Sequence, residues 1–278
     1  MSTMTETRSR TREYYNSTDA DTFYFEVWGG EDIHIGVYEG ENDTIREASR
    51  RTVETMARVL HHREVSTRIL DLGSGYGGSA RYLAQTLGAT VTCVNLSEIQ
   101  NERNRTLNSD AGLAEKITVL DGSFEDIPCP DASFDVVWTQ DAILHSGDRE
   151  KVFHEVDRVL APGGEWVFTD PMQRGGVPPR DLAPVLSRLQ LDSLGSIDDY
   201  KIYADKLGWE LLGVNEMPDQ LRRHYQQVHD DLEARSADFD GRVSADYIVR
   251  MLAGLRHWVE ASRAQRLNWG ILHFKKPA

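Results

Sequence analysis

The sequence is poor in cysteine, in lysine and in long apolar runs. Its 278 residues contain two cysteines, which is too few for a disulfide framework. Basic residues number 31 against 45 acidic ones, a formal net charge of −14, and no basic stripe stands out. This balance excludes nucleic acid and anionic membrane surfaces as expected partners, because both bind clustered lysine and arginine. No apolar stretch reaches the roughly 18 residues of a membrane span and the N-terminus is polar, so we expect a cytoplasmic protein without a membrane partner.

The chain does contain enough apolar material for a large core. Hydrophobic residues make up 40% of it and aromatic residues 9%, which excludes a mainly disordered protein. An acidic, lysine-poor surface suits a salty cytoplasm, because hydrated carboxylates keep a protein dissolved. An ordinary acidic enzyme explains the same composition equally well.

Short apolar strands alternate with amphipathic helices through the middle of the chain. The strand-like segments are residues 68–72, 90–95, 117–120, 134–139 and 165–169. Helical patterns occupy residues 78–87, 97–108 and 149–160. This alternation is typical of βαβ units and predicts an α/β fold with a parallel, doubly wound sheet. Residues 181–207 predict a helical stretch, residues 209–214 predict a sixth strand, and residues 269–274 predict a terminal one.

Changes in this rhythm divide the chain into four parts. Residues 1–20 are polar and aperiodic, which predicts a flexible tail, and residues 21–62 predict an N-terminal cap of helices. Residues 63–215 and 267–278 form the predicted core. Between the last two strands, residues 216–266 carry helical patterning. Because so long a connection inside a compact domain is usually functional, we expect a helical lid over the substrate.

A glycine-rich loop follows the first strand. It reads Asp-Leu-Gly-Ser-Gly-Tyr-Gly-Gly over residues 71–78, and Gly73, Gly75 and Gly78 fit the dinucleotide spacing. A pyrophosphate here would meet the carboxylate of Asp71, a like-charge contact costing on the order of 1 kcal/mol or more. S-adenosylmethionine has no phosphate and carries an ammonium and a sulfonium, so the same acid favours it. Asn95, at the end of the second strand, can form a hydrogen bond with the ribose of S-adenosylmethionine or of a nicotinamide cofactor. This residue therefore does not decide between the two cofactors.

Further motifs at the strand ends favour S-adenosylmethionine. Residues 121–126 end the third strand, where Phe124 and the loop backbone can meet an adenine ring. Gln140 and Asp141 end the fourth strand. Because ligands of open α/β sheets bind outside the carboxyl ends of the strands, these side chains are expected in one crevice.

Residues 69–170 together resemble the class I S-adenosylmethionine-dependent methyltransferases. Much more of the chain resembles one branch of them, the sarcosine/dimethylglycine N-methyltransferases of glycine betaine synthesis. The matching stretches are residues 28–36, 75–83, 95–98, 140–146, 169–172, 223–225, 243–248 and 269–271. The resemblance implies a Rossmann-like, doubly wound sheet of seven strands with an antiparallel last strand, accompanied by the cap and the lid.

The resemblance also implies in-line methyl transfer from S-adenosylmethionine to the neutral amine of sarcosine and of dimethylglycine. S-adenosylhomocysteine is then the second product, no metal takes part, and a monomer or homodimer binds the small amine. Alternatives remain open. Asp141 and Asp170 could hold Mg²⁺ for an O-methyltransferase, the acceptor could be a carbon or a bulkier amine, and an NAD-dependent oxidoreductase is the most distant reading.

The site residues follow from these motifs and from the resemblance. The expected cofactor contacts are Asp71, Gly73, Ser74, Gly75, Asn95, Leu96, Gln100, Ser123, Phe124, Gln140, His34 and Trp28. The expected catalytic residues are Gln140, Asp141 and His145, with His145 as base or orienter of the amine. Asp141 and His145 share a face if a helix begins at residue 141; alternatively Asp141 caps that helix and His145 is a buried core histidine.

Substrate contacts are expected from aromatic rings and from one arginine. Aromatic faces suit a methylated ammonium, and a guanidinium suits a carboxylate, for which Arg223 is the expected residue. The expected substrate contacts are Tyr24, Met172, Tyr203, Arg223, His224, Tyr225 and Trp269.

Overall fold

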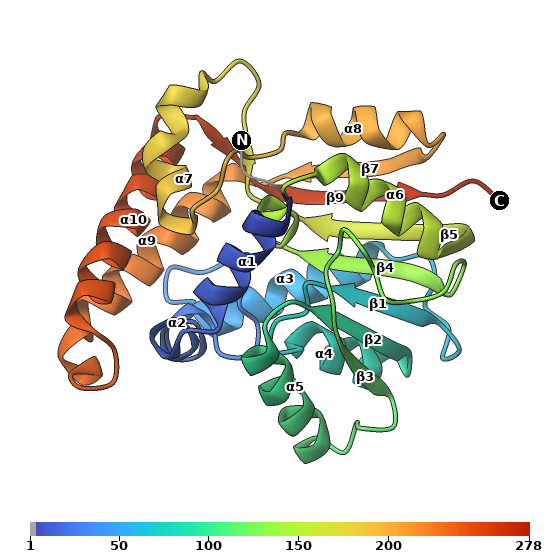
Figure 1. Ribbon diagram of the computed structural model, residues 1–278, viewed down its shortest axis with the longest axis horizontal. Coiled ribbons are helices and arrows are strands. Elements are labelled where there is room, and N and C mark those ends of the chain that lie inside the picture. Colours follow the sequence, from blue (N-terminus) through green and yellow to red (C-terminus); the bar gives the residue numbers. More distant parts are fainter. Residues whose placement is uncertain (1–3) are drawn as a thin grey trace.

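A mixed sheet of seven strands crosses the computed structural model, which describes residues 4–278 (Figure 1). The strand order is β3-β2-β1-β4-β5-β9-β7. Its strands are β1 (Arg68–Leu72), β2 (Thr90–Asn95), β3 (Ile117–Asp121), β4 (Phe134–Gln140), β5 (Leu160–Thr169), β7 (Glu210–Glu216) and β9 (Gly270–Lys275). Neighbours among β1 to β5 are parallel, whereas β9 runs antiparallel to both β5 and β7. The predicted doubly wound sheet with an antiparallel last strand is therefore confirmed.

Helices cover both faces of this sheet, because the inner strands are apolar on both sides. The covering helices are α3 (Ile45–Val59), α4 (Gly78–Leu87), α5 (Glu98–Asp110), α6 (Arg149–Val159) and α8 (Ile197–Lys206). On one face, α3 and α4 bury Met56 and Leu83 against Trp138 of β4. On the other face, α6 and α8 bury Phe153 against Trp166 of β5. α5 lies against β2 and β3.

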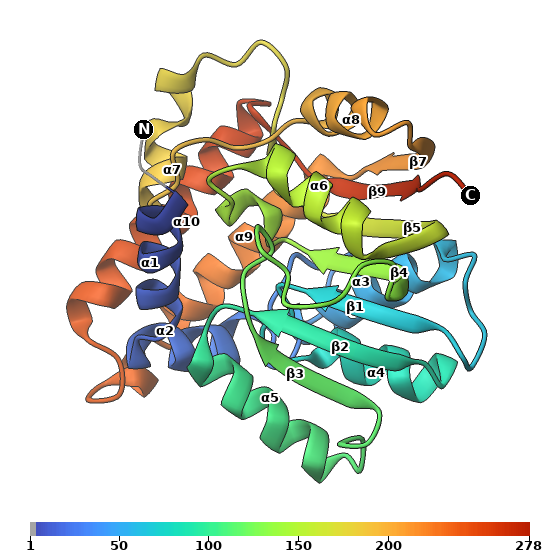
Figure 2. The ribbon, with the colours of Figure 1, turned by 45° about the vertical axis from the view of Figure 1, so that its right-hand side comes forward.

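A further set of helices gathers at the carboxyl ends of the parallel strands (Figures 1 and 2). We call this set the helical cap. It comprises α1 (Met4–Tyr15), α2 (Thr18–Phe23), the π-helix η1 (Tyr24–Trp28), α7 (Ala183–Leu189), α9 (Pro218–Ala234) and α10 (Ala245–Arg263), with the 3₁₀ turns η3 (Pro179–Leu182) and η4 (Ser236–Phe239). From α2 onward the cap encloses an apolar cluster of its own, with Phe23, Leu221 and Leu255 buried in it. The two-stranded sheet of β6 (Met172–Gln173) and β8 (Leu267–Asn268) lies between cap and sheet.

The N-terminal segment differs from the flexible tail predicted for residues 1–20. Residues 1–3 lie outside the described residues, and most of the remainder forms α1 and α2. Polar contacts hold this segment: Arg8 Nε donates to Glu125 Oε2 at 2.7 Å, and Asn16 Nδ2 donates to Glu98 Oε2 at 2.9 Å. Ionic and aromatic contacts leave no aliphatic period in a sequence, which is why the pattern predicted a tail.

Two predicted boundaries also move. The predicted cap of residues 21–62 includes α3, yet Val53 and Met56 place that helix in the core of the sheet. The helical stretch expected within residues 181–207 divides into α7 and α8. Of these, α7 packs on α10 in the cap, where Trp258 Nε1 donates to the carbonyl of Val185 at 3.2 Å. Local periodicity predicts a helix well but does not identify the layer that the helix joins.

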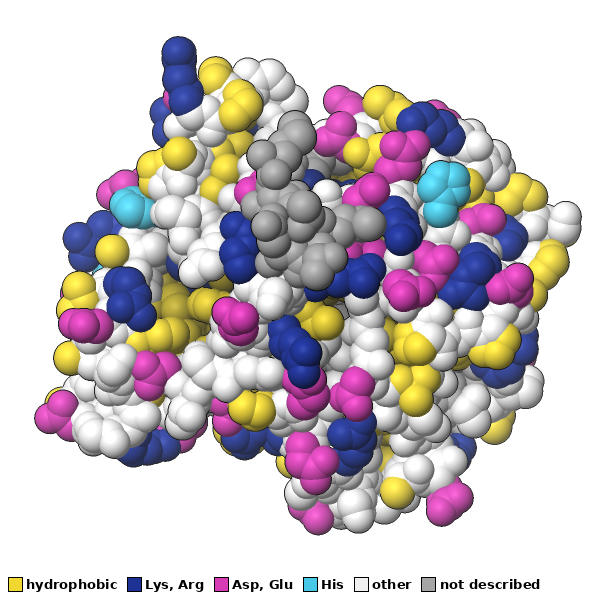
Figure 3. Space-filling view, viewed as in Figure 1, with side chains coloured by type: hydrophobic (Ala, Val, Ile, Leu, Met, Phe, Trp, Pro, Cys, Tyr) yellow, Lys and Arg dark blue, Asp and Glu magenta, His cyan; other side chains and the backbone are white. Residues whose placement is uncertain are grey.

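The surface mixes charges of both signs. Figure 3 shows acidic and basic side chains side by side around α5 and α6, and a recess with hydrophobic side chains between α10 and α1. Within residues 4–278, no helix combines the length and the apolar character needed to cross a membrane.

Candidate functional site

The carboxyl ends of the parallel strands border a pocket, here called the edge cavity, whose space together with its open mouth is about 770 Å³. A smaller hollow of about 300 Å³, here called the loop hollow, adjoins it and shares Ile33, Gly73 and Gln140 with it. The predicted cofactor contacts that line the edge cavity are Gly73, Gly75, Asn95, Leu96, Gln100, Ser123, Phe124 and Gln140. Those that line the loop hollow include Asp71, Ser74 and His34. The structure thus brings nearly all of the predicted cofactor residues to one place.

The glycine loop lets the backbone pass between the two hollows. Gly73 has a φ of +81°, and a Cβ atom on it would lie 2.5 Å from the Cβ of Ala142. Its amide donates to the carbonyl of Val94 at 2.8 Å, which ties the loop to β2. Only glycine satisfies both the positive φ and the close approach.

Five buried polar atoms around the loop hollow have no hydrogen-bond partner among the described residues. They are Asp71 Oδ2, Ser74 Oγ, Gln140 Nε2 and both ring nitrogens of His34. Leaving such groups unpaired is costly, so the arrangement suits a polar ligand. An acceptor carboxyl beside several donors matches the ammonium and carboxylate of an α-amino acid. The methionine end of S-adenosylmethionine is such a group, and these residues therefore fit it.

The Asp71 carboxyl is poised to respond to a cation. Burial, followed by the negative charge of Asp32, raises the pKa of Asp71 to about 7. Asp32 is itself paired with Arg50, whose Nη2 lies 2.8 Å from its Oδ2. A positively charged group beside Asp71 would stabilise its ionised form and lower that pKa.

The other end of the edge cavity suits a nucleoside. Leu96 and Phe124 supply apolar walls, as an adenine ring requires. Asn95 Nδ2 donates to Gln100 Oε1 at 3.0 Å, which fixes the amide at the end of β2. Ser97 begins α5 by accepting from the amide of Gln100, so the loop that carries these side chains is held by the helix start.

Gln140 and Asp141 end β4 but differ in what they leave free. Gln140 Oε1 accepts from Trp138 Nε1 at 2.8 Å and from Ser79 Oγ, while its Nε2 has no partner among the described residues. Asp141 uses both oxygens: Oδ2 accepts from the amide of Ile35 at 2.6 Å, and Oδ1 accepts from Trp269 Nε1 at 2.7 Å. Gln140 can therefore bind a ligand, whereas Asp141 joins the N-terminal loop and the start of β9 to the strand end.

The helix expected to begin at residue 141 is absent at that position. Asp141 has a φ of +50°, and the 3₁₀ turn η2 covers Ile143–His145 only. Asp141 and His145 therefore do not share a helix face, and Asp141 caps no α-helix there. A sequence period cannot reveal a left-handed residue between a strand and a turn.

His145 lies at the wall of the edge cavity and is 9% exposed. Its Nε2 lies 2.9 Å from the hydroxyl of Tyr15, and its Nδ1 has no partner among the described residues. Burial, with smaller effects from the charges of Arg188 and Arg149, lowers the pKa of His145 to about 3. The imidazole is therefore neutral near pH 7 and too weak a base to deprotonate an alkylammonium.

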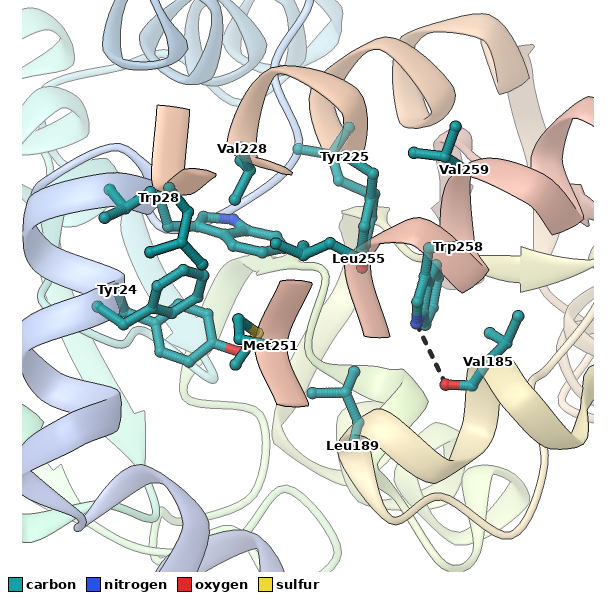
Figure 4. Close-up of a cluster of buried hydrophobic side chains, with 14 of the residues drawn as sticks. Tyr24, Trp28, Val185, Leu189, Tyr225, Val228, Met251, Leu255, Trp258 and Val259 are labelled. Atoms are coloured by element: carbon teal, nitrogen blue, oxygen red, sulfur yellow. Dashed lines mark hydrogen bonds between the residues drawn. The ribbon is translucent and has the colours of Figure 1, made fainter. Parts of the chain in front are cut away.

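Three of the aromatic residues singled out in the sequence meet in the helical cap (Figure 4). The ring centre of Trp28 lies 5.4 Å from those of both Tyr24 and Tyr225, and Tyr225 stacks on Trp258 at 4.6 Å. Trp28, expected at the cofactor, thus lies among the expected substrate contacts. We call Tyr14, Tyr15, Tyr24, Trp28, Tyr225 and Trp258 the aromatic cluster. His224 borders it, with its ring centre 5.2 Å from that of Trp28.

Two expected substrate contacts lie elsewhere. Tyr203 packs on Phe153, at 5.5 Å between ring centres, on the sheet face covered by α6 and α8. Arg223 donates to the carbonyl of Gly40 and lies 4.6 Å from the ring centre of Tyr38. On α9, His224 and Tyr225 are buried and Arg223 is not, so Arg223 points away from the cluster. Residue type alone does not identify the face of a helix.

Met172 and Trp269 flank the end of β5. Met172 in β6 is fully buried, with its side chain in the cluster beneath α6 and α8. Trp269 is also fully buried, and its indole nitrogen donates to Asp141 as described above. Both residues support the walls of the site.

Residues of α1 and α7 were missed at the sequence level. Arg8, Thr11 and Tyr15 line the edge cavity at spacings that place them on one face of α1. A pair of tyrosines ending a polar segment was the available signal. Arg188 of α7 reaches the aromatic cluster, with its guanidinium carbon 5.3 Å from the ring centre of Trp28. Nothing in the local sequence distinguished Arg188 from solvated arginines.

Comparison with known proteins gives consistent matches. A family model described as a methyltransferase domain matches residues 70–168. The sarcosine/dimethylglycine N-methyltransferase of Aphanothece halophytica is 49% identical over 266 residues, 96% of each chain. That of Halorhodospira halochloris is 47% identical over 265 residues, 95% of each chain. The crystal structure of a proposed sarcosine dimethylglycine methyltransferase from Galdieria sulphuraria is 44% identical, with a TM-score of 0.89 and coverage of 95% of this chain and 99% of that one.

Proposed function

The chain belongs to the sarcosine/dimethylglycine N-methyltransferases, a branch of the class I S-adenosylmethionine-dependent enzymes, and on that premise we propose that it methylates sarcosine and dimethylglycine to give glycine betaine. The observation that carries the proposal is that the likeness extends over the helical cap as well as the sheet. The sheet supports many methyl acceptors, whereas the parts around it select one. An NAD-dependent oxidoreductase therefore loses its support.

The residues around both hollows are suited to S-adenosylmethionine. When bound, this cofactor supplies a methyl group activated by a positively charged sulfur and leaves as S-adenosylhomocysteine. Asp71 would hold its ammonium, and the unpartnered donors of Ser74 and Gln140 would hold its carboxylate. Leu96 and Phe124 would enclose its adenine.

The acceptor nitrogen must be unprotonated, because only a free lone pair can attack a methyl carbon. With its pKa lowered to about 3, His145 does not remove a proton from an alkylammonium. The positive charges of Arg149 and Arg188 that lower this pKa also disfavour a protonated amine near His145. We infer that the site selects the neutral amine and that His145, bonded to Tyr15, positions it for in-line attack.

We propose that the reaction needs no metal. The two acids considered for Mg²⁺ already use their oxygens: Asp141 bonds Ile35 and Trp269, while Asp170 accepts from the amide of Leu144 at 2.9 Å and from Tyr200 Oη at 2.5 Å. A Mg²⁺-dependent O-methyltransferase needs free carboxylate oxygens at this place. This argues against that alternative.

A methyl-donor assay with glycine, sarcosine and dimethylglycine in parallel tests the proposal. S-adenosylhomocysteine should form with sarcosine and with dimethylglycine, at the same rate before and after treatment with EDTA. Gly73→Val serves as the inactive control, because its side chain would collide with Ala142. Turnover of a catechol or of phosphoethanolamine without turnover of either amino acid would contradict the proposal.

We further propose a cytoplasmic enzyme that acts as a monomer or homodimer on a small free amine. The two cysteines, Cys93 and Cys129, are both unpaired, as a reducing compartment favours. Sedimentation of the purified protein checks the assembly, and a species larger than a dimer would contradict this part.

A further inference from the structure

Arg188 of α7 carries its charge into the aromatic cluster of the cap. Its guanidinium carbon lies 5.3 Å from the ring centre of Trp28, 5.4 Å from that of Tyr225 and 5.8 Å from that of Trp258. Figure 4 places these three rings between α7, α9 and α10, with the indole of Trp28 directed toward Tyr225. Aromatic faces attract a cation but carry no net charge with which to neutralise it.

The guanidinium of Arg188 has only weak partners. Nη2 donates to Tyr225 Oη and Nη1 to Met251 Sδ, each at 3.3 Å, and the buried Nε has no partner among the described residues. Within residues 8–278, no carboxylate oxygen lies within 4.0 Å of it. Burial raises the pKa of Tyr14 well above its usual value. The nearby Tyr14 phenol is therefore neutral and supplies no negative charge to Arg188. A partly buried cation without an anionic partner is unfavourable, and an anionic ligand would relieve that cost.

The fold makes room for this side chain at the expense of helix stability. Gly254 lies inside α10, and a Cβ atom on it would stand 2.6 Å from both Cγ and Cδ of Arg188. Glycine within a helix is less favourable than alanine. The glycine at position 254 is therefore explained by the Arg188 stem, which passes this point of α10 on its way to the cluster.

A groove connects Arg188 with solvent, and tyrosines connect it with the reaction centre. The groove lies between α1 and α10 and is lined by Tyr14 and Arg188, and its space together with its open mouth is about 1060 Å³. It corresponds to the recess in Figure 3. Tyr14 Oη lies 3.1 Å from Tyr24 Oη, and the ring of Tyr15 lies 5.4 Å from that of Tyr24. Tyr15 in turn bonds His145 in the edge cavity. Arg188 and His145 thus lie at two ends of one tyrosine-lined region.

We propose that Arg188 binds the carboxylate of the amino-acid substrate, while the surrounding aromatic rings hold its methylated nitrogen toward His145. The inference rests on the proposed function and identifies the residue that restricts it to acceptors with a carboxylate. A guanidinium offers two parallel donors to a carboxylate, and aromatic faces suit a nitrogen that gains methyl groups. Arg223, the residue expected from the sequence, is bonded to Gly40 instead.

Arg188→Gln tests the assignment, with Arg223→Gln as the matched control, because Arg223 also lies against an aromatic ring. The Arg188 variant should lose on the order of 100-fold in kcat/KM for dimethylglycine, mainly through KM. Its Kd for S-adenosylhomocysteine, measured by calorimetry, should match that of the native protein. Arg188→Lys should recover part of the loss, because it keeps the charge but not the planar fork. Arg223→Gln should leave KM unchanged.

A second acceptor separates a lost ion pair from general damage to the site. N,N-Dimethylethanolamine has a hydroxymethyl group where dimethylglycine has a carboxylate. Its turnover by the native protein should be poor, and Arg188→Gln should change it by less than about threefold. An equal loss for both acceptors, or an unchanged KM for dimethylglycine, would overturn the assignment.

Gly254→Ala moves Arg188 without deleting it. The added methyl group would crowd the Arg188 stem, so KM for dimethylglycine should rise by several-fold. The gain in helix propensity offsets part of the cost of this clash, so the melting temperature should change little compared with KM. An unchanged KM would contradict the role of Gly254.

Thermal melting distinguishes ligand binding from a packing role. If Arg188 binds the substrate carboxylate, the ligand-free Arg188→Gln variant should melt no lower than the ligand-free native protein. Added dimethylglycine should raise the melting temperature of the native protein but not that of the variant. A clear fall in melting temperature together with unchanged kinetics would assign Arg188 to packing. If the native protein binds the cofactor but methylates neither sarcosine nor dimethylglycine, the proposed function fails, and that result is visible before any variant is compared.

Discussion

The protonation state of the buried Asp71 carboxyl should affect how tightly the cofactor binds. Its pKa is raised to about 7, and an ammonium placed beside it lowers that pKa. Binding below about pH 7 must then release a proton. Affinity for S-adenosylmethionine should therefore fall as the pH decreases from 7, by up to about tenfold per pH unit. Calorimetry in two buffers of different ionisation enthalpy measures the released proton directly.

Asp71→Asn provides the control for this pH dependence, because it keeps the size of the side chain and removes the titrating group. At pH 8 its affinity should be weaker by about 10- to 100-fold, the loss expected for a charge-assisted bond. The proton release should disappear with it. A variant that still releases one proton would shift the assignment to another group.

At the level of residues, the sequence predicted which side chains gather at the ends of the strands but not how the side chains of the cap are directed. Asp71 and Asn95 end adjacent parallel strands, and strand order alone brings such residues to one edge. Trp28, Arg223 and Asp141 needed information that a sequence does not carry. Their side-chain directions depend on a π-helix, on the exposed face of α9 and on a left-handed residue, respectively.

Among the elements, α1 is the one that covers the edge cavity. Arg8 pairs with Glu125, whose side chain is only 2% exposed and also accepts from Ser146 Oγ at 2.7 Å. Arg8→Gln should loosen α1 and speed the dissociation of S-adenosylhomocysteine by several-fold, since the pair is partly buried. Stopped-flow fluorescence of the bound complex measures the rate.

Glu13→Gln is the control on the same helix, because the contact that Glu13 makes is with Ser9 of α1 itself. It should leave the dissociation rate unchanged. Equal rates in the Arg8 variant and the native protein would mean that other contacts of α1 close the cavity.

The elements themselves divide by how they are stabilised. β1 to β5, α4 and α6 bury apolar side chains at regular spacing, and the sequence pattern located each of them within a few residues, apart from the earlier start of β5. The pattern located α5 as well, although the residues that α5 buries are polar: Gln100, Asn101, Asn104 and Asn108. α3 even has a capping box of Thr44 and Glu47 at its start. α1 lacks such a pattern because its inner face is tyrosine and arginine. An element held mainly by polar and aromatic contacts with distant segments escapes a reading of local periodicity.

For the whole molecule, the net charge of −14 predicts a response to salt. Mutual repulsion destabilises a compact acidic chain, and added salt screens it. The melting temperature at pH 8 should therefore rise by a few degrees between about 0.05 and about 0.5 M sodium chloride. The same addition near the isoelectric point of 5.1 should have little effect, because the net charge is then close to zero. A rise of equal size at both pH values would contradict this explanation.

The helical cap marks the limit of sequence prediction at this scale. Its apolar cluster collects residues from α2, η1, α7, α9 and α10, and in the sequence β1 to β5 lie between η1 and α7. Each helix has an apolar face, but nothing local specifies which faces meet. Similarity to known proteins, rather than periodicity, therefore linked the cap to an amino-acid acceptor.

The two sides of α1 have one more consequence, for the order of events in catalysis. Arg8 and Tyr15 face the edge cavity, whereas Tyr14 faces the groove that leads to Arg188. If donor and acceptor bind where we propose, the spent donor and the partly methylated acceptor would leave by separate routes. A sarcosine molecule can stay in place while the donor is renewed, so both methyl groups can be added in a single residence, and little dimethylglycine should escape before it becomes betaine.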